Sequence, residues 1–222
     1  MLFGQIDPIG VRAEVDRQLD LFEAHWQAPP DHVDGHQHIQ QFPMLRRAVV
    51  EAVQHRYPRH QRPWVRVSQP VAQQRGFKPW LIAYMGASAL AQMAPRKEVP
   101  ASQALVGITD FQGDAQAWLA QARTWLGWVS NRSGVVMMCH PGWLQEDASD
   151  PIAEARAREH EALAGPQWPA LLQQMLHLTV NQTDRWLAGN AANLDPNQQL
   201  ALQGAQTTCF YLAWVVSCYG VL

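Results

Sequence analysis

The chain has 222 residues, of which 47% are hydrophobic and 16% are charged, a balance typical of a water-soluble globular protein with one sizeable core. The formal net charge of −2 gives no electrostatic signature of nucleic-acid binding, and we expect no nucleic-acid partner. The three cysteines, Cys139, Cys209 and Cys218, lack the spacing of a metal site or a disulfide framework. Because the first residues also lack the features of a signal peptide, we expect a cytoplasmic protein.

The sequence of the first half of the chain predicts helices and short strands. Asp7 and Pro8 are a typical helix start, with Asp as the cap and Pro in the first turn. Apolar residues follow at helical spacing and predict one buried face: Val11, Val15, Leu19, Phe22 and Trp26. Residues 31–43 predict an extended stretch that runs into a turn. We expect a second helix over residues 43–55 and a strand over residues 64–67.

The second half alternates strands with helices. We expect strands over residues 105–111 and 134–139, and helices over residues 115–129 and 152–163. The helix over 115–129 carries a wide apolar stripe of Trp118, Leu119, Ala122, Trp125 and Leu126. This alternation indicates an α/β fold with parallel strands. The periodicity weakens after residue 169, and the apolar run over 209–222 is shorter than the roughly 20 residues of a membrane span.

Histidine and aspartate alternate in one short segment. His32, Asp34, His36 and His38 would share one face if the segment were a strand, because strand side chains alternate between faces. Imidazole and carboxylate together suit zinc, manganese or magnesium. Gly35 leaves room for another group to approach the backbone. A polar, solvent-facing strand that happens to be rich in histidine is the alternative.

A second histidine follows the strand predicted over residues 134–139. His140 lies at its C-terminal end, before Pro141 and Gly142, and chemistry in parallel α/β folds concentrates at such ends. A capping or turn role for His140 is the alternative. Three of the ten tryptophans, Trp64, Trp80 and Trp143, could stack on sugar rings, although tryptophans at helical spacing generally belong to the core. Trp143 is the best candidate for such a platform.

These motifs together resemble those of a known enzyme family. The segment His32-Val-Asp-Gly-His-Gln-His38, followed by Gln-Phe-Pro43, resembles the hallmark of the YdjC-like carbohydrate deacetylases, which include chitooligosaccharide deacetylases and hopanoid-associated relatives. Residues 136–142, Val-Met-Met-Cys-His-Pro-Gly, resemble the family's second hallmark, and the helix around Arg156 and Glu159 resembles the one that follows it. Arg66 lies where the family tends to carry an arginine on a strand. The resemblance covers roughly residues 5–165.

The resemblance implies an α/β fold, here an incomplete, distorted (β/α) barrel of the polysaccharide-deacetylase-like type. It implies residues 1–169 as a partial barrel domain and leaves residues 170–222 as a divergent segment of uncertain structure. Family members use one divalent metal ion, Mg or Zn, to remove acetyl groups from N-acetylated sugars or oligosaccharides. The metal polarises the acetyl carbonyl and activates a water, a carboxylate takes a proton from that water, and a histidine protonates the amine.

Carried over to this sequence, the resemblance implies His36 as a metal ligand and His140 as the general acid. Asp34 and His38 would orient the ligand or line the sugar pocket. His32 and Trp143 are further candidates, either for contact with a metal ligand or for contact with the substrate. Arg66 would touch substrate or form an interior salt bridge.

Two family motifs do not occur in this sequence: the opening strand that ends in Asn-Ala-Asp-Asp, and the later Gly-x-His segment. They would supply two of the three metal ligands and the base. We therefore expect an N-terminally truncated deacetylase chain that is inactive or only partly active. Loss of the first strands would expose an apolar edge that favours a homo-oligomer.

Two other functions remain open at this stage. The histidine-rich segment could serve another metal-dependent hydrolase such as a phosphoesterase, for which Asp110 and Asp114 are the nearest further carboxylates. The chain could also be a non-catalytic remnant that associates through its exposed core.

Overall fold

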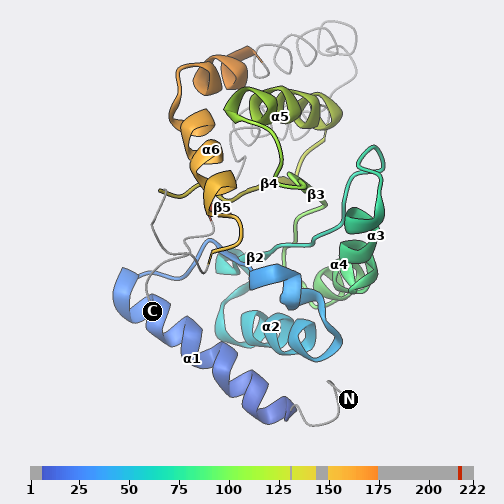
Figure 1. The fold of residues 1–222 in the computed structure, drawn as a ribbon. Coiled ribbons are helices and arrows are strands. Elements are labelled where there is room, and N and C mark those ends of the chain that lie inside the picture. Colours follow the sequence, from blue (N-terminus) through green and yellow to red (C-terminus); the bar gives the residue numbers. More distant parts are fainter. Residues whose placement is uncertain (1–6, 131, 144–149, 175–214, 217–222) are drawn as a thin grey trace, which may run out of the picture. The chain divides into compact units, whose positions relative to one another are not determined.

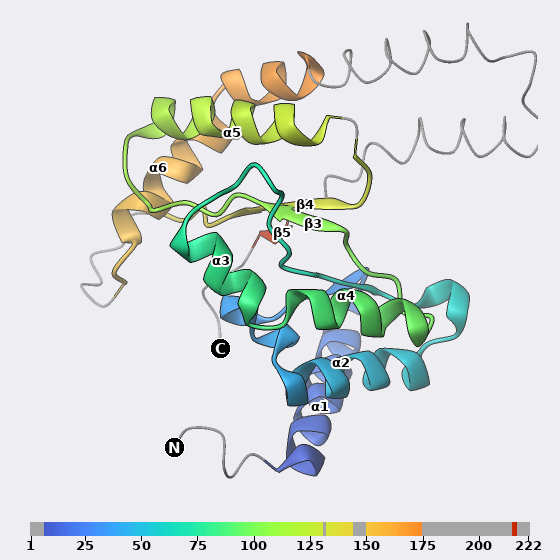
Figure 2. The same ribbon diagram turned by 90° about the vertical axis from the view of Figure 1, so that its right-hand side faces the viewer.

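The computed structural model describes residues 7–130, 132–143, 150–174 and 215–216. The chain divides into two compact units, Met1–Leu105 and Val106–Leu222. Its architecture is a helix-rich α/β fold with small parallel sheets (Figures 1 and 2). The barrel type and the domain boundary at residue 169 stay predictions. Within the described residues, no helix combines the length and the apolar character needed to cross a membrane.

The first unit is built mainly from helices around one apolar core. Its elements are α1 (Pro8–Trp26), β1 (His32–Val33), the 3-10 helix η1 (His36–Gln41), α2 (Pro43–Arg56), the 3-10 helix η2 (Arg59–Gln61), β2 (Trp64–Val65), α3 (Phe77–Tyr84) and α4 (Ala87–Arg96). β1 and β2 pair in parallel, with His32 opposite Trp64 and Val33 opposite Val65. The core joins α1, α2, β2 and α4 and includes Leu19, Val49, Val50, Val53, Val65, Leu90 and Ala94.

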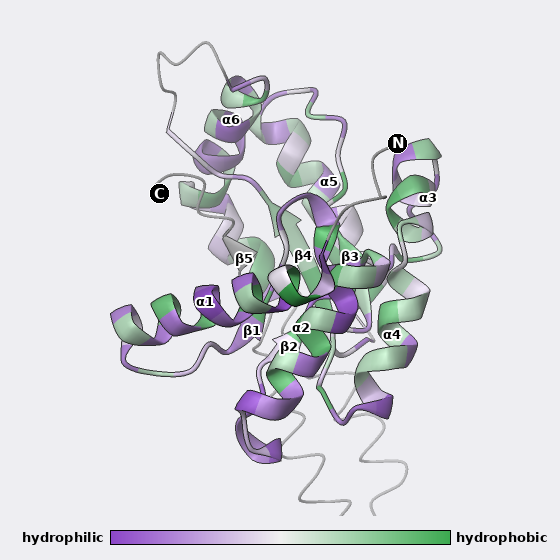
Figure 3. Cartoon of the chain, turned by 90° about the horizontal axis from the view of Figure 1, so that it is seen from below, coloured by the Kyte–Doolittle hydropathy of each residue, from purple (hydrophilic) through white to green (hydrophobic). Residues whose placement is uncertain are grey.

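The start of α1 follows the predicted capping chemistry. The Asp7 side chain accepts hydrogen bonds from the backbone amides of Ile9 and Gly10, and Pro8 is the first helical residue. The apolar face is less buried than its spacing predicts: Leu19 is buried, whereas Phe22 and Trp26 are 38% and 65% exposed. The bands of purple and green along α1 in Figure 3 fit a helix that lies on the surface of its unit.

The second unit follows its predicted elements except at the strand expected over residues 105–111, which spans only Ala104–Val106. It contains α5 (Ala115–Val129), β4 (Val135–Cys139), α6 (Ala153–Ala164) and β5 (Val215–Val216), and the division of the chain falls within β3 (Ala104–Val106). The strand order is β3–β4–β5, and β4 and β5 run parallel. Asp114 caps α5 through the amide of Ala117. The predicted stripe of α5 is confirmed as buried at Trp118, Ala122, Trp125 and Leu126.

Two helices, α3 and α4, were not predicted. Each is short, follows a glycine with a positive φ, and contains a proline: Pro79 in α3 and Pro95 in α4. Glycine and proline ordinarily mark turns, so the residues at both ends of these helices predict loops. The spacing of Ala87, Leu90 and Ala94 on the buried face of α4 is the signal that predicts a helix there.

A glycine allows the chain after β3 to lie against β4. Gly107 has a φ of +94°, and a Cβ on it would collide with the backbone carbonyl oxygen of Met138. We predict that Gly107→Ala lowers the free energy of unfolding by about 2–3 kcal/mol, because it combines backbone strain with a backbone clash. Urea denaturation followed by circular dichroism measures this change.

Gly127→Ala is the matched control. Gly127 lies within α5, and a Cβ there has no atom within 4 Å. Since alanine favours a helix interior by about 1 kcal/mol over glycine, this substitution should be neutral or stabilising. Equal destabilisation by the two substitutions would contradict the close approach at Gly107.

Candidate functional site

The histidine-rich segment is not one strand. β1 ends at Val33, and His36 to Gln41 form a 3-10 helix in which Gln37 and His38 have φ values of 50° and 65°. His36 is therefore exposed while His38 is 9% exposed, and the predicted shared strand face is wrong. The absence of a side chain at Gly35 permits this turn, because a Cβ there would sit 2.7 Å from the backbone nitrogen of Gln40. The close approach predicted at Gly35 is confirmed, but it comes from the segment turning back on itself.

Asp34 and Arg66 form an ion pair that joins the residue after β1 to the residue after β2. Arg66 Nε donates to Asp34 Oδ1 at 2.5 Å, and Arg66 Nη2 donates to the carbonyl oxygen of Gly35 at 3.1 Å. The Arg66 side chain is 4% exposed. Burial lowers its pKa, while the charge of Asp34 opposes that shift. The expected arginine on a strand thus makes an interior salt bridge.

His38 belongs to a buried hydrogen-bond network. Its Nδ1 lies 2.8 Å from Ser68 Oγ. Gln40 Nε2 donates to the same Ser68 oxygen at 3.2 Å and to the Arg66 carbonyl oxygen at 3.0 Å. His32 stacks on Trp64 across the β1–β2 pair, with ring centroids 4.8 Å apart. The structure therefore ties His38 and His32 to neighbouring protein groups.

His140 lies directly after β4, as predicted. Its backbone amide donates to Glu159 Oε2 on α6 at 2.5 Å, and Glu159 is 2% exposed. His140 Nδ1 is 3.9 Å from Glu159 Oε1 and, among the described residues, has no hydrogen-bond partner although it is buried. The ring of Phe111 contacts the imidazole edge to face, with centroids 5.3 Å apart. Glu159 thus fixes the backbone of His140, and the ring of Phe111 packs against its imidazole.

The neighbouring cysteine is chemically inert in this setting. Burial, reinforced by the negative charge of Glu159, raises the pKa of the Cys139 thiol to about 12. The thiolate is the nucleophilic form of cysteine, so Cys139 does not supply a nucleophile near neutral pH.

Trp143 is displayed at the surface two residues beyond Pro141. It is 75% exposed, and its ring lies against His160 of α6 with centroids 4.2 Å apart. The preceding Gly142 amide donates to the Arg156 carbonyl oxygen at 3.1 Å, which fixes this segment to α6. Trp143 is therefore outside the core, as a sugar platform requires.

Sequence reasoning did not assign a role to Glu159 or to the Ser68–Gln40 pair. Glu159 belongs to the helix expected over residues 152–163, and its side chain is buried on the same face as Ala155 and Ala162. Its spacing of four residues from Ala155 and three from Ala162 was the sequence signal that Glu159 shares the buried face of the helix. Nothing in the local sequence indicates that Gln40 is 1% exposed.

The side chains present do not fit a complete metal site. Among the described residues, no three His, Cys, Asp or Glu side chains are grouped to hold an ion. Asp34 and His38 are already bonded to Arg66 and Ser68. Catalytic zinc sites typically use three protein ligands. His36 remains the one exposed member of the predicted set.

The carboxylates considered for a phosphoesterase have local roles. Asp114 caps α5, and Asp110 Oδ1 accepts a hydrogen bond from the Gln112 amide at 3.2 Å. Both side chains stabilise the backbone around the start of α5, and no observation favours that alternative.

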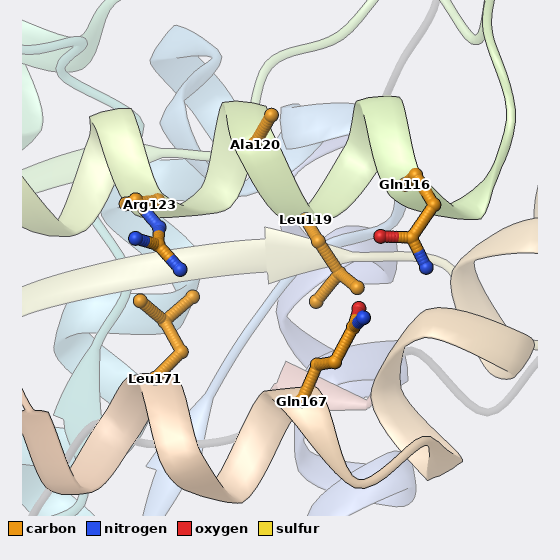
Figure 4. A pocket seen from close by; sticks show the side chains of 6 residues that line it. All are labelled: Gln116, Leu119, Ala120, Arg123, Gln167 and Leu171. Atoms are coloured by element: carbon orange, nitrogen blue, oxygen red, sulfur yellow. The ribbon is translucent and has the colours of Figure 1, made fainter.

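A separate depression lies in the second unit between α5 and the helical residues 167–174. Its volume is about 360 Å³. Figure 4 shows its lining, which comprises Gln116, Leu119, Ala120, Arg123, Gln167 and Leu171. The lining contains no acid, histidine or cysteine, so this depression lacks the groups that hydrolysis needs.

Comparison with known proteins supports the resemblance. A family model described as YdjC-like protein matches residues 1–174, a range that includes both histidine motifs. No curated protein and no solved structure matches the chain.

The Asp34–Arg66 pair generates a stability prediction. Asp34→Ala leaves the buried Arg66 guanidinium without its carboxylate, so we predict a loss of about 2–4 kcal/mol in the free energy of unfolding. Asp34 is 21% exposed, which places this value below that of a fully buried pair. Urea denaturation at neutral pH measures it.

The control is Glu14→Ala, which removes the exposed Arg17–Glu14 pair on α1. Exposed pairs of this kind contribute little to stability. A similar small loss in both variants would show that the Asp34–Arg66 bond does not hold the turn after β1.

Proposed function

The chain belongs to the YdjC-like family, and we propose that its function is carbohydrate N-deacetylation, the hydrolysis of the amide between an acetyl group and a sugar amine. Membership of this family suggests a carbohydrate deacetylase-type hydrolase. The observation that supports the proposal most is His140, which follows a parallel strand, rests on a buried carboxylate and precedes an exposed tryptophan.

We assign His140 the role of proton donor. When the amide is hydrolysed, the carbon–nitrogen bond breaks and the departing nitrogen must gain a proton to leave as an amine. A positioned histidine supplies such a proton efficiently because its charge changes near neutral pH. Glu159 is near enough, at 3.9 Å from Nδ1, to stabilise the protonated imidazole electrostatically.

Trp143 is assigned to the sugar. An exposed indole offers a large apolar face to the C–H groups on one side of a pyranose ring, while hydroxyl groups around that ring stay in water. The contact of Trp143 with His160 limits the orientations of the indole. We therefore expect N-acetylated sugars or oligosaccharides to stack on Trp143.

Deacetylases of this family are typically metal-dependent, and a divalent ion such as Mg or Zn would supply polarisation of the acetyl carbonyl. In this chain we assign only His36 to such an ion. We do not assign Asp34 and His38 to the ion, because Asp34 bonds within the turn after β1 and His38 bonds to Ser68. We therefore propose that the chain by itself is inactive or only partly active.

A binding measurement tests the carbohydrate function. We predict that the chain binds the N-acetylated chitin dimer in isothermal titration calorimetry, and that Trp143→Ala weakens this affinity about fivefold because one stacked ring is lost. Trp26→Ala on α1 removes another exposed tryptophan, at 65% exposure, and should leave the affinity unchanged.

Failure of the dimer to bind, or equal losses in the two variants, would contradict the assignment of Trp143. Acetate release from the same dimer, with added Mg or Zn, tests the incomplete metal site separately. We expect little or no release. Strong release that disappears in His36→Ala would show that the ligand set is complete.

A further inference from the structure

Helix α3 carries a row of exposed aromatic rings. Phe77, Trp80 and Tyr84 are 75%, 57% and 76% exposed. Their spacing of three and four residues brings the rings together: the centroids of Phe77 and Trp80 are 5.8 Å apart, and those of Trp80 and Tyr84 are 5.4 Å apart with the rings inclined by only 15°. We call these three residues the aromatic row.

The opposite side of α3 anchors the helix. Pro79 and Ile82 are buried, and α3 packs against α4 (Figure 2). The buried amide of Gln41 donates to the Ile82 carbonyl oxygen at 2.6 Å. The orientation of α3 is therefore fixed by α4 and by the bond from Gln41, and the aromatic row is exposed to solvent.

This exposure needs a physical explanation. Single exposed apolar side chains are ordinary on protein surfaces, but a contiguous group of large ones marks a binding surface. The three rings form such a group on a helix of only eight residues. The segment that precedes α3 carries two exposed polar residues, Gln73 and Arg75.

The size of the aromatic row favours a small ligand over a protein partner. An eight-residue helix is about 12 Å long. A stable protein interface buries about 800 Å² on each partner. Three aromatic side chains supply roughly 450–750 Å² even when each is fully covered, and these are already partly covered by their own stacking. The surface is too small for a stable dimer but matches a few rings of an extended chain.

We propose that the aromatic row is a second sugar-binding surface, which holds an N-acetylated oligosaccharide by stacking its pyranose rings. This proposal rests on the carbohydrate function proposed above and assigns a contact on the first unit in addition to Trp143. Pyranose rings present an apolar C–H face and a hydroxyl rim, which complement aromatic faces flanked by polar side chains. The surface binds substrate and takes no part in bond breaking.

The test uses the full chain and the N-acetylated chitin hexamer, with affinity measured by isothermal titration calorimetry. We expect Trp80→Ala/Tyr84→Ala to weaken hexamer binding about tenfold, since two stacking rings are removed. The matched control is Phe22→Ala/Trp26→Ala, which removes the exposed stacked pair on α1, whose centroids are 6.1 Å apart, and should leave hexamer affinity unchanged. Circular dichroism checks that both variants are folded.

The proposal is overturned if the wild-type chain does not bind the hexamer, or if the α3 and α1 variants lose affinity equally or not at all. It is also overturned if light scattering shows that the wild-type chain self-associates, the α3 variant is monomeric, and the hexamer binds both with equal affinity. That result would assign the aromatic row to a second copy. Loss of hexamer binding in the α3 variant, together with no effect of Trp143→Ala on the dimer, would support this surface while contradicting the site around His140.

Discussion

The ion pair between Asp34 and Arg66 fixes the chain at the point where the histidine-rich segment leaves β1. It ties the residue after β1 to the residue after β2, and the same guanidinium binds the carbonyl oxygen of Gly35. The parallel pairing of β1 with β2 brings Asp34 to Arg66. A buried charge is costly unless it is paired, so the bonds of Arg66 to Asp34 and to the Gly35 carbonyl oxygen fix the chain where η1 begins. In η1 that follows, His36 is exposed to solvent, whereas His38 is buried and bonded to Ser68.

The predicted site residues fall into two groups in the structure, those that stabilise the first unit and His140 of the second unit. Asp34, His38 and His32 stabilise the first unit, through an ion pair, a hydrogen bond and a ring stack respectively. His140 is different, because its backbone is fixed by Glu159 while its Nδ1 has no hydrogen-bond partner among the described residues. A buried polar atom without a partner is uncommon in folded proteins and is often associated with a functional role. The histidine of the second unit therefore carries more of the proposed chemistry than the histidines of the first.

The sequence predicted the long helices well because their signals are local. Asp7 and Asp114 cap α1 and α5, and the tryptophans of α5 follow a helical period into the core. β4 was equally clear as a short apolar run between polar turns. The turn after β1 was not predictable in this way, because alternating polar residues suggest a strand whether or not the chain stays extended. Its conformation depends on Arg66, which is 32 residues away from Asp34 in the sequence.

The central claim is that the turn after β1 exposes His36 to solvent and buries His38. Zinc titration in competition with a chromophoric chelator tests it directly, using the wild-type chain, His36→Ala and His38→Gln. We predict that His36→Ala lowers the zinc affinity of the chain and that folded His38→Gln leaves it unchanged, since His38 is bonded to Ser68. Equal losses in the two variants would show that both imidazoles converge on one ion, and would contradict the account of the turn after β1.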